Sequence, residues 1–159
     1  MSSEAPQSNE SLAKGSKKAR RSAARLAAVQ SIYAIDVGEL SPAHVIEDVL
    51  VNRQGQMLED EEMVTPDGVL YKKIVNGVQQ QRENLLEITE KPCPRLKSGE
   101  LEPLLGSIIL AGCFELLMHE DIDAPIIINE YLNITHAFYG GQEAKMVNGV
   151  LDSLAKVLR

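Results

Sequence analysis

Cationic side chains cluster near the N-terminus at intervals that a helix would align. The cluster consists of Lys14, Lys17, Lys18, Arg20, Arg21 and Arg25. Its members recur every three or four positions, so a helix would carry them as a stripe along one face and its border. Such a stripe binds phosphates through salt-dependent counterion release, and arginine also stacks on unpaired bases and bonds to base edges. This segment, the basic arm (residues 14–25), therefore favours binding of RNA or DNA rather than of a small anion.

The charge is divided unevenly along the chain. Residues 1–25 hold six Lys and Arg against two Glu, a net charge of +4, and the rest holds ten against 21 Asp and Glu, a net charge of −11. A basic end on an acidic, self-repelling body is expected when one end meets a polyanion and the rest does not. A solvated basic tail without a partner is the alternative that charge alone leaves open.

Residue patterns that support catalysis or metal binding are absent from the sequence. Glu115 and His119 lie four positions apart, but on an apolar helix they fit a structural hydrogen-bonding group and a partner of the helix C-terminus. His44 and His136 lack neighbours at ligand spacing, and neither a glycine-rich phosphate loop nor a nucleophile set occurs. We therefore expect no enzyme, no metal and no cofactor.

Composition places the chain among globular proteins. Its 159 residues, 44% of them hydrophobic, suffice for one domain or for two small helical halves with a shared core. No apolar run approaches the roughly 18 residues that span a bilayer, and no signal peptide is present, so we expect a soluble, cytosolic protein without membrane contact. Cys93 and Cys113 fit reduced thiols, and only six aromatic residues argue against stacking platforms.

The elements that would position the basic arm are helices. A Ser-Pro pair at 41–42 has the form of a helix start, Gly55 closes that segment, and Thr-Pro-Asp at 65–67 repeats the start signal. The helix that begins there should run to about Glu90, because Lys-Pro-Cys-Pro at 91–94 forbids its continuation. This proline pair is the best candidate for an internal boundary.

The second half of the chain also has helical periodicity. Residues 101–117 are apolar nearly all round, which predicts a central helix, and residues 127–138 and 147–158 predict two amphipathic helices. We therefore expect an all-α fold of six or seven helices in two halves. Residues 1–13 should form a disordered tail. The acidic run at 59–62 should be a solvated loop, with a docking patch for a basic partner as the alternative.

A four-residue motif occurs twice in the sequence and places glycine inside a predicted helix each time. Val-Asn-Gly-Val occurs at 75–78 and again at 147–150, where glycine costs about 1 kcal/mol relative to alanine in a helix. Close approach of two helices would offset that cost, and we favour this explanation for Gly77. Asn148 has a second possible role as an exposed polar group near the basic arm.

Four segments, taken in order, resemble the NusB family of transcription antitermination factors. They are Ala-Arg-Leu-Ala-Ala-Val-Gln-Ser-Ile-Tyr at 24–33, Phe-Glu-Leu at 114–116, Ile-Asn-Glu at 128–130 and Lys-Met-Val-Asn-Gly-Val-Leu-Asp at 145–152. The resemblance covers residues 18–159. It implies two stacked three-helix bundles in one domain over 14–159, the first reaching about residue 90 and the second beginning near 95, and no catalysis.

The resemblance also implies partners. Family members bind the boxA sequence of ribosomal RNA leader transcripts as single-stranded RNA together with the ribosomal protein NusE, and so help RNA polymerase to escape premature termination. With the basic arm, it predicts RNA contacts at Lys17, Lys18, Arg20, Arg21, Arg25, Lys145 and Asn148. It predicts NusE contacts at Tyr33, Val37, Leu105 and Phe138.

The chain departs from the family pattern near Leu105, at a short loop around Gly140 and Gly141, and at Met146. Leu105, Gly106 and Leu110 stand where a charged pair and an arginine are common, so this apolar surface belongs to the core, to a partner interface or to a homodimer. Whether the protein is a monomer or a homodimer stays open. Met146 replaces the usual phenylalanine, which removes an aromatic group that would stack on RNA.

Three other readings compete with a boxA-binding adaptor. One is a general nucleic-acid-binding transcription regulator with this fold but without boxA specificity. A DNA-binding regulator is disfavoured because helices after residue 25 are acidic or apolar and offer no recognition helix. An enzyme would need a site assembled from Glu115, Glu130 and His119.

Overall fold

The computed structural model describes residues 13–56 and 64–159. Nearly all of the tail expected at 1–13, and the acidic run at 59–62, lie outside these residues. The helices are α2 (Lys17–Gly38), α3 (Pro42–Gln56), α4 (Gly68–Gln80), α5 (Arg82–Glu90), α6 (Pro94–Lys97), α7 (Pro103–Met118), α8 (Ala124–Phe138) and α9 (Gly141–Leu158). The described part of the chain contains no strand, which confirms the all-α prediction.

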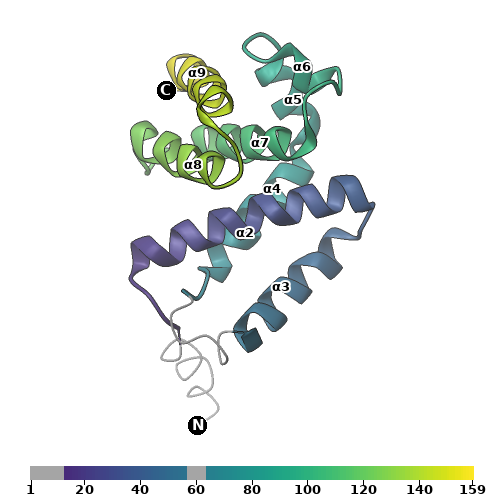
Figure 1. The fold of residues 1–159 in the computed structure, drawn as a ribbon, viewed down its shortest axis with the longest axis vertical. Helices are drawn as coiled ribbons and strands as arrows, with labels where there is room; N and C mark the ends of the chain where they lie inside the picture. The colour runs from purple at the N-terminus through teal and green to yellow at the C-terminus, as the bar shows by residue number, and fades with distance from the viewer. Residues whose placement is uncertain (1–12, 57–63) are drawn as a thin grey trace.

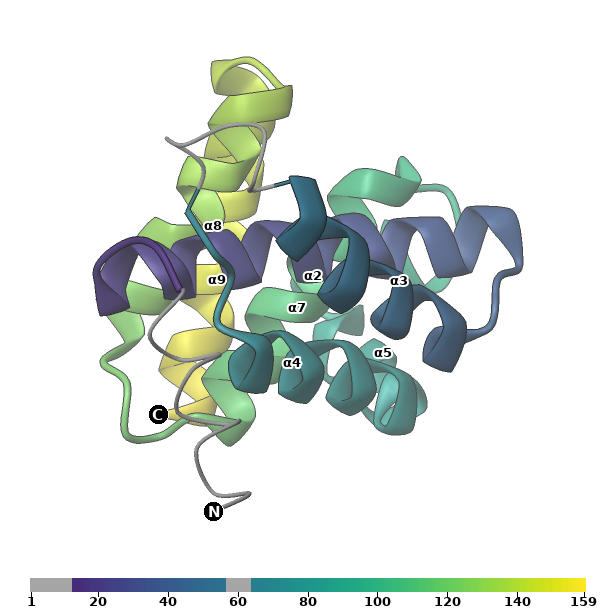
Figure 2. The same cartoon turned by 90° about the horizontal axis from the view of Figure 1, so that it is seen from below.

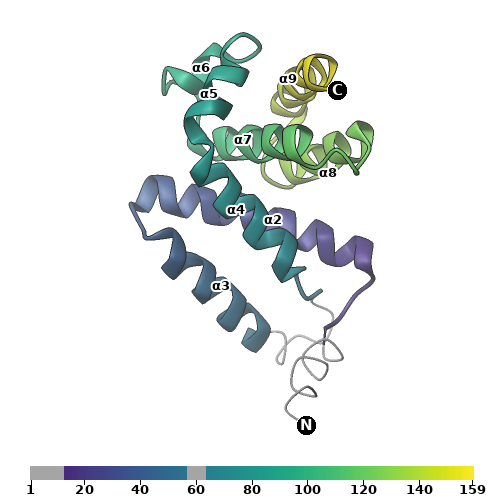
Figure 3. The ribbon, with the colours of Figure 1, turned by 180° about the vertical axis from the view of Figure 1, so that it is seen from behind.

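The helix α2 connects the two halves of the molecule. It runs across the structure in Figure 1, with α3 on one side and α7, α8 and α9 on the other. Seen from behind, α4 crosses α2 (Figure 3), and the two helices pack together. On the far side α8 and α9 run beside each other and pack on α7 (Figure 2). The basic arm therefore sits on a helix that contacts both halves.

Two boundaries differ from those predicted. The helix expected to reach Glu90 is broken at Gln81, whose backbone (φ −107°, ψ 15°) is not helical. The break redirects the chain, since α4 packs on α2 and α7 whereas α5 packs on α6, α7 and α9. The proline pair also starts α6, a single turn that begins at Pro94 and that hydrophobic periodicity cannot detect. These additions bring the helices of the described residues to eight.

The helix α7 forms the centre of the core, as its apolar surface predicts. Ile108, Ile109 and Leu116 are fully buried, and α2, α4, α5, α8 and α9 all contact this helix. Glycine lets α4 approach it closely. A Cβ atom at Gly77 would lie 2.1 Å from the ring of Phe114, which confirms close packing as the reason for glycine at this position.

Candidate nucleic-acid interface

The first turn of α2 presents cations to solvent. Ser16 caps the helix, its Oγ accepting a hydrogen bond from the Ala19 N–H at 3.1 Å, and the first turn contains no acidic residue. Lys17, Lys18 and Arg21 are exposed. Because the N-terminus of a helix already carries partial positive charge, cations there repel the helix dipole and an anion would relieve the repulsion. The arrangement is unfavourable for the isolated helix and favourable for binding phosphate.

The arm is fixed to the segment before α4. The Lys14 N–H donates to Thr65 Oγ1 at 2.9 Å, and the Thr65 N–H donates to the Lys14 carbonyl at 2.9 Å. The Asp67 N–H donates to the Arg20 carbonyl at 3.0 Å, and Arg20 Nε donates to the Thr65 carbonyl at 3.1 Å. Arg20 is therefore half-buried and partly engaged in structure. These bonds make the arm a preformed surface rather than a loose tail.

Arg25 does not belong to the exposed stripe, which corrects its placement from the sequence. Its side chain is 2% exposed, with Nε 2.7 Å from Glu115 Oε2 and Nη1 3.4 Å from Glu130 Oε1. Burial disfavours the Arg25 cation, but hydrogen bonding and the charge of Glu115 outweigh burial and raise the arginine's pKa. In this structure the guanidinium joins α2 to α7 and α8 and offers no surface to RNA.

Glu115 is the centre of this buried network. Besides Arg25, it accepts hydrogen bonds from the Tyr131 hydroxyl at 2.5 Å and contacts His119 Nδ1 at 2.9 Å. Burial favours protonation of Glu115, but hydrogen bonds to His119 and Arg25 and the arginine charge outweigh it and lower the carboxyl pKa. The structural role expected for Glu115 is confirmed. The carboxylate is fully buried and forms several bonds, so it is closed to a substrate. This argues against an enzyme whose site is assembled from Glu115, Glu130 and His119.

Glu130, the other carboxylate beside Arg25, ties the arm to α8. Its Oε1 and Oε2 accept from Ser22 Oγ at 2.8 and 2.9 Å. One signal of this network is visible in the sequence: a lone glutamate at 115 in an apolar helix, since a buried charge requires a partner. Which of the arm's arginines would be that partner was not evident from helical spacing.

The other predicted RNA contacts lie on α9. Lys145 and Asn148 are exposed and lie three positions apart on one face of α9. Within the described residues, neither is linked to the arm by a hydrogen bond or an ion pair. A Cβ atom at Gly149 would meet nothing within 4 Å, so close packing does not explain this second Asn-Gly pair.

The predicted partner residues divide into an exposed set and a buried one. Tyr33, Val37 and Phe138 are 36%, 53% and 42% exposed, and we call them the apolar patch. Leu105 is 7% exposed and packs in the core, which corrects its assignment as a partner contact and decides among the three roles left open. Gly106 and Leu110 are buried with it.

Glu102 and Tyr139 brace the edge of the apolar patch. The Tyr139 hydroxyl donates to Glu102, whose carboxylate also caps α7 by accepting from the N–H groups of Leu104 and Leu105 at 3.1 and 3.3 Å. Burial, and then the Glu102 carboxylate, raise the pKa of Tyr139 well above its ordinary value, with a smaller effect of Tyr33. Tyr33 on α2 thus lies near the residue that follows Phe138.

Neither a metal site nor a membrane-spanning helix occurs among the described residues. No group of three His, Cys, Asp or Glu side chains is placed to hold a metal ion among residues 13–56 and 64–159. In the same ranges, no helix has the length and apolar character needed to cross a membrane.

Comparisons of the amino-acid sequence identify one family. The model of the NusB family matches residues 22–156. Proteins named transcription antitermination protein NusB are similar to this chain: that of Rhizobium rhizogenes is 34% identical over 141 residues, 88% of each chain. That of Novosphingobium aromaticivorans is 38% identical over 144 residues, 87% of this chain and 95% of that protein. Antitermination is not an enzymatic reaction, which agrees with the prediction that the chain is not an enzyme.

Solved structures share the fold. NusB of T. maritima has a TM-score of 0.71 at 17% identity, with 86% of this chain and 90% of that chain covered. A structure described as the antitermination factors NusB and NusE in complex with dsRNA has a TM-score of 0.69 at 20% identity, with 89% and 99% covered. The family match over most of the chain and relatives above 30% identity lead to one conclusion: this chain belongs to the NusB family and is a transcription antitermination factor.

Proposed function

We propose that this protein binds boxA-type single-stranded RNA of ribosomal RNA leader transcripts together with the ribosomal protein NusE, and that the complex promotes processive elongation by RNA polymerase in the cytoplasm. The observation that carries the proposal is the exposed cationic first turn of α2, held in place by the bonds between Lys14, Arg20 and Thr65. A preformed cationic surface loses little conformational freedom when it binds.

The RNA surface consists of two parts in this proposal. Lys17, Lys18 and Arg21 bind phosphates and, through the arginine, a base, while Arg20 contributes the part of its side chain that remains accessible. Lys145 and Asn148 add contacts from α9, and Asn148 can bond to a base edge. Phosphate contacts supply most of the affinity, and base contacts supply the preference for boxA.

NusE binds the apolar patch of Tyr33, Val37 and Phe138 in this proposal. Exposed aromatic and branched side chains near a polar rim are typical of partner interfaces. The structural relative that contains NusB, NusE and RNA supports the pairing, because its fold covers 89% of this chain. If NusE strengthens the binding of RNA, RNA must strengthen the binding of NusE by the same factor.

The test is RNA binding measured across a salt series. A variant with Lys17→Gln, Lys18→Gln and Arg21→Gln should bind a boxA RNA more weakly and should reduce the slope of log affinity against log salt by roughly two, since each lost contact to single-stranded RNA removes about 0.7. Far-ultraviolet circular dichroism should stay unchanged because the three side chains are exposed. An unaltered salt slope would refute the arm as the RNA site.

A matched control separates the arm from general charge. Lys91→Gln, Lys97→Gln and Lys156→Gln remove the same charge from exposed positions outside the arm. The control variant should keep the wild-type salt slope. Scrambled RNA and duplex DNA test the runner-up reading: equal affinity for boxA and scrambled RNA, with or without NusE, would favour a general nucleic-acid-binding regulator of this fold.

A further inference from the structure

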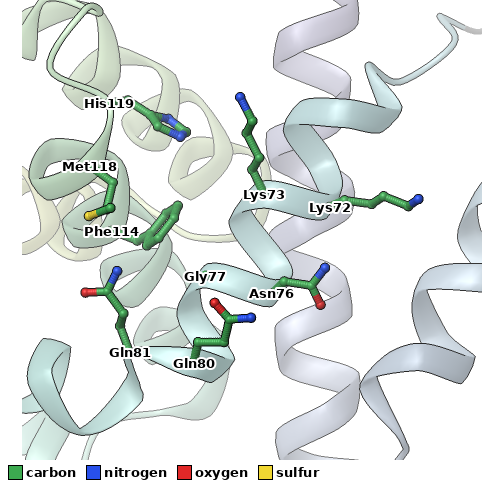
Figure 4. Close-up of a pocket in the computed structure, with 9 residues that line it drawn as sticks. All are labelled: Lys72, Lys73, Asn76, Gly77, Gln80, Gln81, Phe114, Met118 and His119. Carbon is green, nitrogen blue, oxygen red and sulfur yellow. The ribbon is translucent and has the colours of Figure 1, made fainter.

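A hollow of about 500 Å³ lies between α4 and the end of α7, outside the arm and the apolar patch. Its wall on the α4 side carries lysine and amide side chains, including Lys73, Gln80 and Gln81, and its opposite wall carries Phe114, Met118 and His119 (Figure 4). A site lined by a cation, hydrogen-bonding amides and an apolar surface matches the phosphate, base edge and base plane of an unpaired nucleotide.

A second hollow connects this site to the arm. It encloses about 280 Å³ and is lined by Arg21 of the arm together with Lys73 and His119, which also line the first hollow. Asp67 and Asp121 flank it as well. Asp67 is engaged at the start of α4, where its Oδ1 accepts from the N–H groups of Val69 and Leu70. An RNA strand that extends from Arg21 along this hollow would therefore reach Lys73 next.

Lys73 is the lysine that lines both the first and the second hollow. In Figure 4 its side chain extends toward His119, whereas Lys72 and Asn76 point to the opposite side of α4. The latter two also line a hollow against α3. Lys73 is exposed and forms no ion pair within the described residues, so its charge is available to a phosphate.

The apolar wall is held in a fixed position. The Phe114 ring packs on Gly77, where a Cβ atom would lie 2.1 Å from it, and stands edge-on to the His119 ring at a centroid distance of 5.5 Å. His119 is in turn bonded to the buried Glu115 at 2.9 Å. Met118 is 51% exposed beside them and adds a polarisable surface. Because Phe114 is only 5% exposed, Met118 supplies most of the apolar surface that this wall offers a base, and Phe114 and His119 fix the wall behind it.

We propose that this hollow receives an unpaired nucleotide of the RNA held by the arm. Lys73 binds its phosphate, the base lies against Met118 and the accessible edge of Phe114, and Gln80 and Gln81 bond to the base edge. The inference rests on the proposed function, because the arm must first hold RNA. It extends the RNA path from α2 across α4, to a surface distinct from the α9 residues.

The length of the RNA tests the path. Wild-type protein is titrated with unstructured boxA-containing RNAs of about 8 and about 16 nucleotides, chosen to reach the arm alone or the arm and the hollow. Lys73→Gln should leave the affinity for the short RNA unchanged. It should weaken the binding of the long RNA roughly fivefold and reduce the salt slope of that binding by about 0.7, as expected for one lost phosphate contact.

The control is Lys91→Gln, which removes the same charge at an exposed position outside both hollows. This variant should bind both RNAs with the wild-type affinity. If Lys73→Gln and Lys91→Gln act alike on the long RNA, or if wild-type protein binds both lengths equally, the inference is overturned while binding at the arm stands. If wild-type protein binds neither RNA, the proposed function fails and the inference fails with it.

Photochemical cross-linking locates the nucleotide directly. Long RNA substituted with thiouridine should cross-link to residues 72–81, and Lys73→Glu should abolish that cross-link while those on α2 persist. Cross-links confined to α2 and α9 would overturn the inference. Protection of the hollow by NusE instead of by RNA, read by hydrogen exchange of α4, would also overturn it and assign this surface to a protein partner.

Discussion

Arg25 and Glu115 form a buried ion pair that fastens α2, the helix that carries the basic arm, to the centre of the core. Their side chains are 2% and 0% exposed, and two guanidinium nitrogens reach the two carboxylate oxygens at 2.7 and 3.1 Å. This bidentate geometry fixes the rotation of α2 about its axis. The pair therefore decides which residues of the arm face solvent.

Removing one partner of the pair should lower the free energy of unfolding. Glu115→Gln leaves the Arg25 cation buried without its main counter-charge, and breaking such a pair costs about 3–5 kcal/mol. Urea denaturation should show the loss, whereas Glu120→Gln, at an exposed site five residues away, should stay near wild type. Equal stabilities of the two variants would contradict a structural role for the pair.

The same carboxylate should make stability depend on pH in the acid range. Contacts with His119 and Arg25 lower the pKa of Glu115 in the folded state below its ordinary value of 4.5, so the unfolded chain binds a proton first as pH falls. The stabilisation is present above about pH 4.5 and is lost as pH falls through the folded-state pKa. The thermal unfolding temperature, measured from pH 7 to pH 3, should therefore fall less steeply for Glu115→Gln than for the wild type. Parallel curves for the two proteins would exclude Glu115 as the titrating group.

The two Asn-Gly pairs should respond oppositely to alanine. At Gly77 the added Cβ would meet the Phe114 ring at 2.1 Å, so Gly77→Ala should destabilise the protein by about 1–3 kcal/mol through overpacking. At Gly149 nothing lies within 4 Å, so Gly149→Ala should stabilise by about 0.5–1 kcal/mol through helix propensity. Urea midpoints measure both. Shifts of the same sign would refute the packing argument.

The sequence sufficed for the fold class and the central helix because apolar periodicity reports burial directly. Residues 101–117 are apolar on every side, and α7 is contacted by five other helices. Gly77 was also interpretable, since a helix tolerates glycine when another side chain needs its space. Breaks without proline or glycine were not predictable, and Gln81 has neither signal; the helices turn there because α4 and α5 pack on different neighbours.

The site was predictable only in part, because helical spacing does not show which part of a helix face is buried. Helical spacing places Arg21 and Arg25 four residues apart on one face, but α2 turns that face from solvent into the core along its length. Arg21 is exposed while Arg25 is buried against Glu115, 90 positions along the chain. A pairing so distant has no local signature. The hollow that Lys73 lines depends on the packing of α4 against α7 and was likewise invisible to spacing.

A charge placed in the apolar patch should weaken binding of NusE without unfolding the protein. Val37 is 53% exposed near the end of α2, so Val37→Glu removes little buried surface but adds a carboxylate that must be desolvated at the interface. Calorimetric titration with NusE should show affinity reduced by roughly tenfold or more.

Val157→Glu is the matched control, because Val157 is 81% exposed near the end of α9, away from the patch. It should bind NusE like the wild type. By reciprocity, Val37→Glu should also reduce the gain that NusE gives to boxA affinity while leaving the affinity for RNA alone unchanged. Unaltered NusE binding by Val37→Glu would place the partner on another surface, and the exposed side chains of Tyr33 and Phe138 would then need a different explanation.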